Sequence, residues 1–205
     1  MSHFRVMVII PADEKDDPNE AVSKRIAAYD ENTRVAPYKV RMSAEDVTRM
    51  AEFYEIEPTD TAALLANMED WSGSEGGTDD DGLFHWSTYN PDSKWDWWCI
   101  DGRYCGTLVM DDFDSITDDC AYGGTSFHPQ GCRTPDYHRN VLPMTELRPD
   151  WSVWAIVTPD GEWHEQAKMG WFATHGEIAP DWDATRYEIA SSYPDHYAVC
   201  VDSHI

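Results

Sequence analysis

The sequence predicts an α+β fold: a mixed or antiparallel sheet with helices packed mainly on one face, and a strand-rich C-terminal half. Three observations predict it. An apolar, β-branched run covers residues 4–10, helical periodicity follows within residues 18–54, and strand-like runs separated by Asp-Gly turns fill the second half. Because 41% of the 205 residues are hydrophobic, we expect a single α+β domain over residues 1–205, with an acidic loop insertion at about residues 69–82.

The chain is predicted to begin with a buried strand and a helix. Residues 4–10 are apolar along their length, which is typical of a central strand that is buried on both faces. A helix is expected to start at Pro18, since proline is tolerated in the first turn, where its missing N–H has no helical partner. Apolar side chains then recur at helical spacing at Val22, Ile26 and Tyr29.

Two more helices and an acidic segment complete the N-terminal half. Residues 35–40 are expected to be extended. Ser43 and Asp46 approximate the capping box of a second helix, and a third helix is expected to begin near Thr59. Residues 69–82 combine acidic residues, glycines and serines with hardly an apolar side chain, which predicts a solvated loop. The ligand spacing of a calcium loop is missing there.

The C-terminal half is predicted as strands joined by turns. Strands are expected at residues 83–89, 95–100, 103–109 and 151–158. Asp-Gly at residues 101–102 predicts a two-residue hairpin turn, and Pro-Asp-Gly at residues 159–161 predicts a type I turn with a glycine bulge. Residues 121–150 are expected to be loop, residues 181–192 a helix, and residues 197–201 a closing strand.

The strong negative charge limits the possible partners. The chain has 39 acidic and 15 basic residues and a formal net charge of -24, which repels bare nucleic acid and anionic membranes. We interpret the charge as a solvated surface, with an acidic mimic of nucleic acid or recognition of a basic host protein as alternatives. The five cysteines form no CxxC pair, so neither a thiolate zinc site nor a disulfide framework is expected. A reducing cytoplasm fits best.

One aromatic and cationic segment, residues 90–104, stands out as a candidate ligand site. Aromatic faces stack planar rings, and cations hold anions, so the segment suits a ligand with a base and a phosphate. The predicted ligand-binding residues are Asn90, Lys94, Trp95, Asp96, Trp97, Arg103 and Tyr104. Trp95 or Trp97 would stack on the base, while Lys94 and Arg103 would hold the phosphate. The alternative interpretation is that the tryptophans are core residues.

A catalytic interpretation has weaker candidates. These are His164, His175, Asp202 and His204. On a strand, Asp202 and His204 would lie on one face. The sequence contains no HExxH motif, spaced zinc-ligand set, GxSxG elbow or phosphate loop, so no metal or cofactor is assigned. Binding without catalysis is therefore favoured over a phosphodiesterase-type hydrolase.

Several motifs along the chain carry a family resemblance. They are NPxSKWDW at residues 90–97, Gly-Arg at 102–103, TPDGEWH at 158–164, and the terminal DxHI. Together they resemble a family of proteins encoded by tailed bacteriophages and prophages. This sequence departs from the pattern at Asp101, where glycine is common, and at Tyr104, where tryptophan is common. These differences affect the turn geometry and one stacking position.

The resemblance implies phage infection as the setting and no particular reaction. We expect a phage accessory, counter-defence protein of the host cell cytoplasm that binds a phosphate-containing nucleotide signal through the aromatic and cationic hairpin. One alternative is a metal-dependent hydrolase that cleaves such a nucleotide. Another is an acidic nucleic-acid mimic that inhibits a basic host defence protein. A homodimer whose interface builds the pocket is left open.

Overall fold

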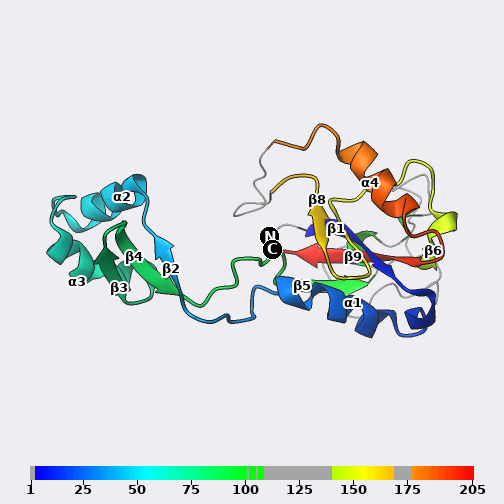
Figure 1. Cartoon of the computed structure of the whole chain (residues 1–205), viewed down its shortest axis with the longest axis horizontal. Helices are drawn as coiled ribbons and strands as arrows, with labels where there is room; N and C mark the ends of the chain where they lie inside the picture. The colour runs from blue at the N-terminus through cyan, green and yellow to red at the C-terminus, as the bar shows by residue number, and fades with distance from the viewer. Residues whose placement is uncertain (1–2, 101, 105, 109–139, 169–176) are drawn as a thin grey trace. The chain divides into compact units, whose positions relative to one another are not determined.

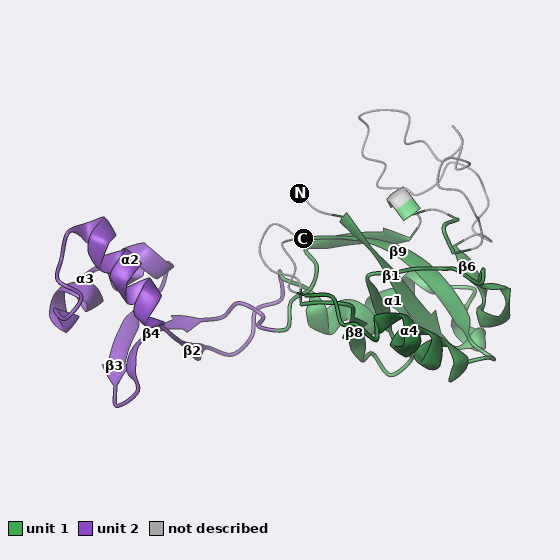
Figure 2. Cartoon of the chain, turned by 90° about the horizontal axis from the view of Figure 1, so that it is seen from above, with its two compact units in different colours: residues 1–31, 92–205 green, residues 32–91 purple. Residues whose placement is uncertain are grey.

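The computed structural model describes residues 3–100, 102–104, 106–108, 140–168 and 177–205. The chain forms two compact units (Figure 2): unit 1 holds Met1–Glu31 and Asp92–Ile205, and unit 2 is the intervening segment Asn32–Pro91. Whether both units fold as the single domain expected from the sequence stays a prediction. The α+β class and the strand-rich C-terminal half are confirmed. No helix among the described residues is long and apolar enough to cross a membrane.

Unit 1 is built on a mixed sheet with strand order β5-β9-β1-β7-β8 (Figure 1). Its strands are β1 (His3–Ile10), β5 (Trp97–Ile100), β6 (Val141–Pro143), β7 (Ala155–Val157), β8 (Trp163–Glu165) and β9 (Tyr197–His204). The predicted central position of the first strand is confirmed, because β1 pairs antiparallel with β9 and parallel with β7. On its other side β9 pairs with β5 near its end and with β6 near its start.

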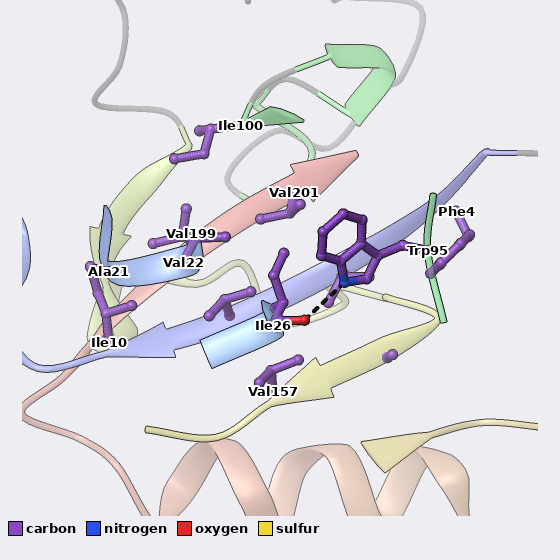
Figure 3. Close-up of a cluster of buried hydrophobic side chains, with 13 residues drawn as sticks. Phe4, Ile10, Ala21, Val22, Ile26, Trp95, Ile100, Val157, Val199 and Val201 are labelled. Atoms are coloured by element: carbon purple, nitrogen blue, oxygen red, sulfur yellow. Dashed lines mark hydrogen bonds between the residues drawn. The ribbon is translucent and has the colours of Figure 1, made fainter. Parts of the chain in front are cut away.

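Helices cover both faces of this sheet, whereas the sequence analysis expected them mainly on one. One face, here the α1 face, packs Val6, Val8 and their neighbours against α1 (Pro18–Ile26). Figure 3 shows other members of this core, among them Ile10, Val22 and Ile26. The other, the α4 face, packs Met7 and Ile9 against α4 (Trp182–Ser191). Since β1 is apolar at odd and even positions, each face needs its own cover.

The two predicted turns have different outcomes. The hairpin at residues 159–161 is confirmed: β7 pairs with β8, and the N–H of Gly161, with φ 88°, donates to the Thr158 carbonyl at 2.9 Å. The hairpin at residues 101–102 is wrong, because β5 pairs with β9 and Gly102–Tyr104 forms a 3-10 turn. Strand β6 lies in the region expected to be loop, and its Leu142 is buried.

Unit 2 has its own sheet and core. Its elements are β2 (Tyr38–Arg41), α2 (Ala44–Tyr54), α3 (Thr61–Ser72), β3 (Gly76–Asp79) and β4 (Gly82–Ser87), with strand order β2-β4-β3. The capping box of Ser43 and Asp46 is confirmed, with both reciprocal hydrogen bonds present. Met50, Ala51, Leu64 and Met68 form the buried centre between the two helices and the sheet. The helices and strands expected here are therefore present.

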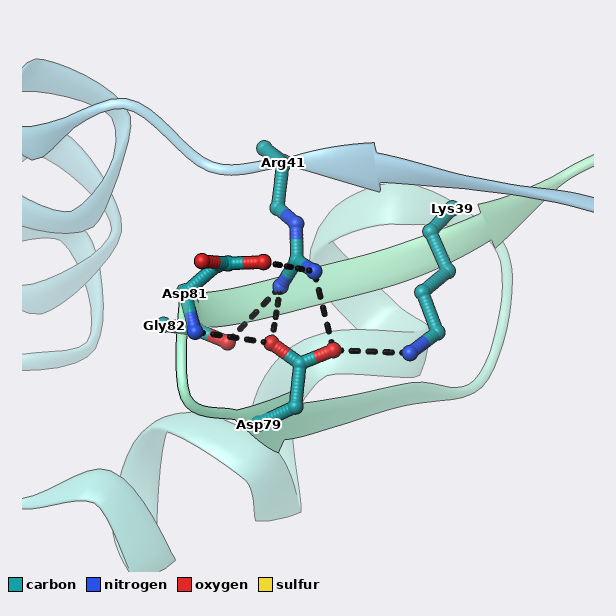
Figure 4. Close-up of polar contacts among 5 residues, drawn as sticks. All are labelled: Lys39, Arg41, Asp79, Asp81 and Gly82. Atoms are coloured by element: carbon teal, nitrogen blue, oxygen red, sulfur yellow. Dashed lines mark hydrogen bonds and ion pairs between the residues drawn. The ribbon is translucent and has the colours of Figure 1, made fainter.

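The acidic loop expected at residues 69–82 is instead the end of α3, strand β3 and a tight turn. A Cβ at Gly77 would lie 2.6 Å from the Phe84 ring, so glycine allows β3 to close against β4. Asp79 pairs with Arg41 and, at 2.7 Å, with Lys39 (Figure 4). The hydrogen bonds from these cations hold the pKa of Asp79 well below its usual range. The acidic composition of this segment thus belongs to an ion-paired hairpin.

Candidate functional site

Two of the predicted ligand-binding residues, Trp95 and Lys94, are held in contacts within unit 1. Trp95 is a core residue of the α1 face, 8% exposed, and its Nε1 donates to the Ile26 carbonyl at 3.0 Å (Figure 3). Lys94 forms an ion pair with Glu165 at 2.7 Å, and the same carboxylate accepts from the Trp163 indole. The Trp95 ring and the Lys94 ammonium are therefore both engaged in contacts within unit 1.

Other predicted residues lie elsewhere. Asn90 is buried and belongs to unit 2. The side chain of Arg103, and His175 as a whole, lie outside the described residues. His164 lies on β8, 3.7 Å from Glu162 through its Nε2. Two strands, β1 and β7, separate His164 on β8 from Asp202 and His204 on β9.

Five predicted residues do converge, and they meet at the polar end of the α4 face. In the strand register, His204 of β9 is the partner of Trp97 on β5 and of His3 on β1. One step along the same face, Asp202 is the partner of Cys99 and of Arg5. We call the following residues the His–Asp cluster: His3, Asp96, Trp97, Tyr104, Asp202 and His204.

Each histidine of the cluster is oriented by a carboxylate. The Nδ1 of His204 lies 2.5 Å from Asp96 Oδ1, and the Nδ1 of His3 lies 2.8 Å from Asp202 Oδ1. A carboxylate only accepts hydrogen bonds, so in each neutral ring Nδ1 carries the proton and Nε2 keeps its lone pair. The two ring centroids are 5.0 Å apart with the planes at 73°. Two imidazoles thus lie edge to face, each fixed by its own acid.

The Nε2 atom of His204 is buried and has no hydrogen-bond partner among the described residues. A buried, unsatisfied acceptor is costly in a folded protein, and such an atom is often explained by a catalytic or ligand-binding role. The cluster is nevertheless accessible at one end, because the Asp96 side chain is 35% exposed while those of His3 and Asp202 are 4% and 1% exposed. A ligand could therefore approach from the Asp96 end.

Aromatic residues complete the surroundings of the cluster. The Tyr104 hydroxyl donates to the His3 carbonyl at 3.0 Å, and the Trp97 ring centroid lies 6.1 Å from that of His3. The α4 face of β5 therefore presents Trp97 to the cluster, whereas Trp98 packs against the core of the α1 face. Trp97 and Tyr104 thus lie at the cluster and not on the expected hairpin, and their role in ligand binding stays a prediction.

Sequence reasoning placed Asp202 and His204 on one strand face, which the structure confirms. It missed His3, Arg5 and Cys99. The available signal was the period of two along residues 3–10, since His3 and Arg5 alternate with the buried Phe4 and Val6. Their meeting with β9 depends on pairing between the first and last strands of the chain, which no local pattern reveals.

The backbone of Gly102 packs directly on Asp202, and this contact gives a testable prediction. Gly102 has φ 53°, and a Cβ there would lie 2.5 Å from the Asp202 Cβ. We expect Gly102→Ala to lower the free energy of unfolding by about 1–2 kcal/mol through the left-handed backbone and by a further 1–3 kcal/mol or so through the overlap. Urea unfolding followed by circular dichroism measures the loss.

Gly161→Ala is the matched control for this prediction. Gly161 also has a positive φ, 88°, but a Cβ there would meet its nearest atom, the Arg25 carbonyl oxygen, at 3.4 Å. It therefore carries the backbone cost with little overlap. Equal losses in the two variants would contradict the packing of Gly102 on Asp202.

The cluster offers acid–base chemistry: two oriented imidazoles, one with a buried and unpartnered Nε2, beside a tyrosine and an arginine. Among the residues that the structure describes, no group of three or more His, Cys, Asp or Glu is placed to hold a metal ion.

Searches of protein-family models, of curated proteins and of solved structures gave no match to this chain.

Proposed function

We propose that the protein hydrolyses a phosphate ester in a nucleotide at the His–Asp cluster. One observation carries this proposal: Asp96 fixes the His204 ring so that its Nε2, buried and without a partner among the described residues, is left as a base. A general base needs such an orientation, since the carboxylate selects the tautomer and stabilises the imidazolium that forms.

The reaction requires two proton transfers, and the cluster has two histidines. His204 Nε2 would take a proton from water as the water oxygen bonds to phosphorus. The bond from phosphorus to the leaving oxygen breaks, and that oxygen takes a proton from the protonated His3 ring. The ring centroids are 5.0 Å apart, close enough for both imidazoles to reach one phosphate group of a substrate. The net change is addition of one water across the ester bond.

The substrate class follows from the neighbours of the histidines and from the family resemblance. Trp97 and Tyr104 supply aromatic surface beside the cluster, and Arg5 is the strand partner of Asp202. Aromatic and cationic groups together favour a base and a phosphate. In the phage setting that the resemblance implies, the substrate would be a nucleotide signal of host defence, and its cleavage in the host cytoplasm would counter that defence.

Retention of the nucleotide without turnover is the second candidate function. It is favoured by the burial of His3 and Asp202, whose side chains are 4% and 1% exposed, because a deeply held ligand leaves slowly. We assign Trp95 no role in either function, because its indole packs in the core of the α1 face.

The test is incubation of the purified protein with cyclic dinucleotides, cyclic trinucleotides, linear dinucleotides and nucleoside triphosphates. Each reaction is run with and without a chelator and analysed by mass spectrometry. We expect a product that carries the mass of one added water and forms equally in both conditions. Loss of the product with chelator would instead support the metal-dependent alternative. An intact nucleotide recovered from the protein would support retention.

The same experiment can contradict the proposal. If no nucleotide is cleaved or retained, the His–Asp cluster is structural and the function lies elsewhere. Salt-sensitive co-purification of a basic host protein would then support a role for the acidic surface, consistent with the net charge of -24.

A further inference from the structure

Three arginines lie around one short segment of unit 1 beside the His–Asp cluster. The segment is residues 148–152, and Arg148 is its first residue. The Nη2 of Arg5 is 3.4 Å from Ser152 Oγ, and the Arg186 guanidinium carbon is 4.8 Å from the Trp151 ring centroid. The chain has only 15 cationic residues against 39 acidic ones, so three together need an explanation. We call Arg5, Arg148 and Arg186 the arginine cluster.

Arg5 is the central member and is poorly neutralised. It lies on β1 two residues after His3, half-buried, and forms no ion pair with a described carboxylate. Its Nε is buried and has no hydrogen-bond partner within the described part of the chain. Its guanidinium carbon lies 5.6 Å from the Tyr104 ring centroid. A half-buried cation without a carboxylate is unusual, because burying a charge is costly unless it is paired.

Arg186, like Arg5, keeps a buried donor without a partner among the described residues, although it also pairs with Asp183. It belongs to α4, is 7% exposed, and stacks on Trp151 and Tyr187. Its Nε donates to Asp183 at 2.9 Å, but its buried Nη1 has no partner among the residues that the structure describes. The aromatic contacts hold the plane of the guanidinium, which leaves one edge of its donor fork unused.

Arg148 contributes the third charge. Its Nε donates to Asp150 Oδ1 at 2.6 Å, and its side chain is 16% exposed. Burial lowers the pKa of Arg5, and the charges of Arg148 and Arg186 lower it further. The mutual repulsion of these three cations destabilises the folded protein, and a bound anion would offset that repulsion.

We infer that the arginine cluster binds a phosphate group of the nucleotide whose ester is cleaved at the His–Asp cluster. This inference rests on the proposed function and adds a requirement to it. Arg5 lies two residue steps along β1 from His3, roughly 7 Å. The substrate therefore carries a second phosphate about that far from the bond that breaks, as neighbouring phosphates of an oligonucleotide or cyclic oligonucleotide do. A mononucleotide with one phosphate cannot fill both clusters.

The first test uses inorganic pyrophosphate as the probe and isothermal titration calorimetry on the whole protein at constant ionic strength. We expect one pyrophosphate per chain. Arg5→Gln and Arg186→Gln should each weaken binding by roughly 10- to 100-fold, since each removes charged hydrogen bonds to the anion. Arg5→Lys keeps the charge and loses the fork, so it should bind with intermediate affinity.

Control variants separate binding from folding. Arg49→Gln removes an exposed cation of unit 2 that pairs with Asp46, and it should leave pyrophosphate binding unchanged. Arg148→Gln changes a member of the cluster whose side chain is more exposed than that of Arg186, 16% against 8%, so the inference can still be tested if the Arg186 variant does not fold. Equal affinity in Arg49→Gln, Arg148→Gln and the unchanged protein would overturn the inference, as would the absence of any pyrophosphate binding.

A kinetic comparison distinguishes this inference from the proposed function. If a nucleotide is cleaved and the arginine variants raise KM about 10-fold or more with little change in kcat, both hold. Cleavage with unchanged KM in every arginine variant would overturn the arginine cluster and leave the proposed function standing. Pyrophosphate binding without cleavage of any nucleotide would leave an anion site and remove the hydrolase.

Discussion

Replacement of His204 by alanine is expected to lower kcat for nucleotide cleavage by about 100- to 10,000-fold, the range typical of a lost general base. His204 is the residue whose Nε2 is buried, without a described partner, and held by Asp96 at 2.5 Å through Nδ1. Because the base acts on the reacting water, kcat should fall while KM changes little. Steady-state kinetics on the substrate found in the panel measures both constants.

Asp96→Asn isolates the orienting role of the carboxylate. An amide can donate to Nδ1, so the proton could move to Nε2 and the base would be lost while the ring stays in place. The side chain of Asp96 is 35% exposed, so this substitution should leave the fold intact. We expect kcat to fall nearly as far as in His204→Ala, with thermal unfolding unchanged.

His164→Ala is the matched control for both variants. His164 lies on β8 beside Glu162, and two strands, β1 and β7, separate β8 from β9. Its removal should leave kcat within about twofold, since a surface histidine outside the site contributes no proton transfer. If His164→Ala and His204→Ala lose activity equally, or if neither does, the His–Asp cluster is not the catalytic site.

Local patterns predicted most of the elements but not how they meet. Three features were predictable from the sequence because propensity, capping and periodicity agree over a few residues. They are the strand at residues 4–10, the helix after Asp17 and the capping box at Ser43. The turn at residues 159–161 was also predictable from local sequence, because it needs a positive φ that glycine adopts easily, and Gly161 has φ 88°. Local chemistry determines each of these features.

The pairing of β9 was not predictable in this way. This strand pairs with β1, β5 and β6, which are distant in the sequence, and the same pairing creates the His–Asp cluster. The Asp-Gly pair at residues 101–102 has the composition of a hairpin turn, yet β9 takes the place of the expected partner strand. A turn signal gives no information about a competing strand about 100 residues away in the sequence.

Composition misled the interpretation of residues 69–82 and of the aromatic segment. Acidic residues and glycines predicted a loop, but Arg41 and Lys39 neutralise Asp79, and glycine lets β3 approach Phe84. The three tryptophans of residues 95–98 are close in sequence, but Trp95 and Trp98 contact the core of the α1 face whereas Trp97 lies on the α4 face, because Trp95 precedes β5 and escapes its alternation. Clustering along the chain did not imply clustering in space.

Replacement of Trp95 by alanine is expected to lower the free energy of unfolding of the protein by about 3–5 kcal/mol, as for other buried aromatic side chains. The indole is 8% exposed and packs with Val22, Ile26 and the β1 side chains of the α1 face. Its Nε1 also donates to the Ile26 carbonyl at 3.0 Å, which holds the end of α1. The variant therefore loses both apolar contacts and a buried hydrogen bond.

Trp95→Phe and Trp97→Ala separate these contributions from ligand binding. Trp95→Phe keeps a ring but leaves the Ile26 carbonyl without its donor, at a cost of about 1–3 kcal/mol. Trp97 is only partly buried, so Trp97→Ala should destabilise the protein less than Trp95→Ala and should weaken nucleotide binding. Urea unfolding by circular dichroism and nucleotide titration measure the two effects. A Trp95→Phe variant that folds but loses the nucleotide would show that the ring contacts the ligand after all.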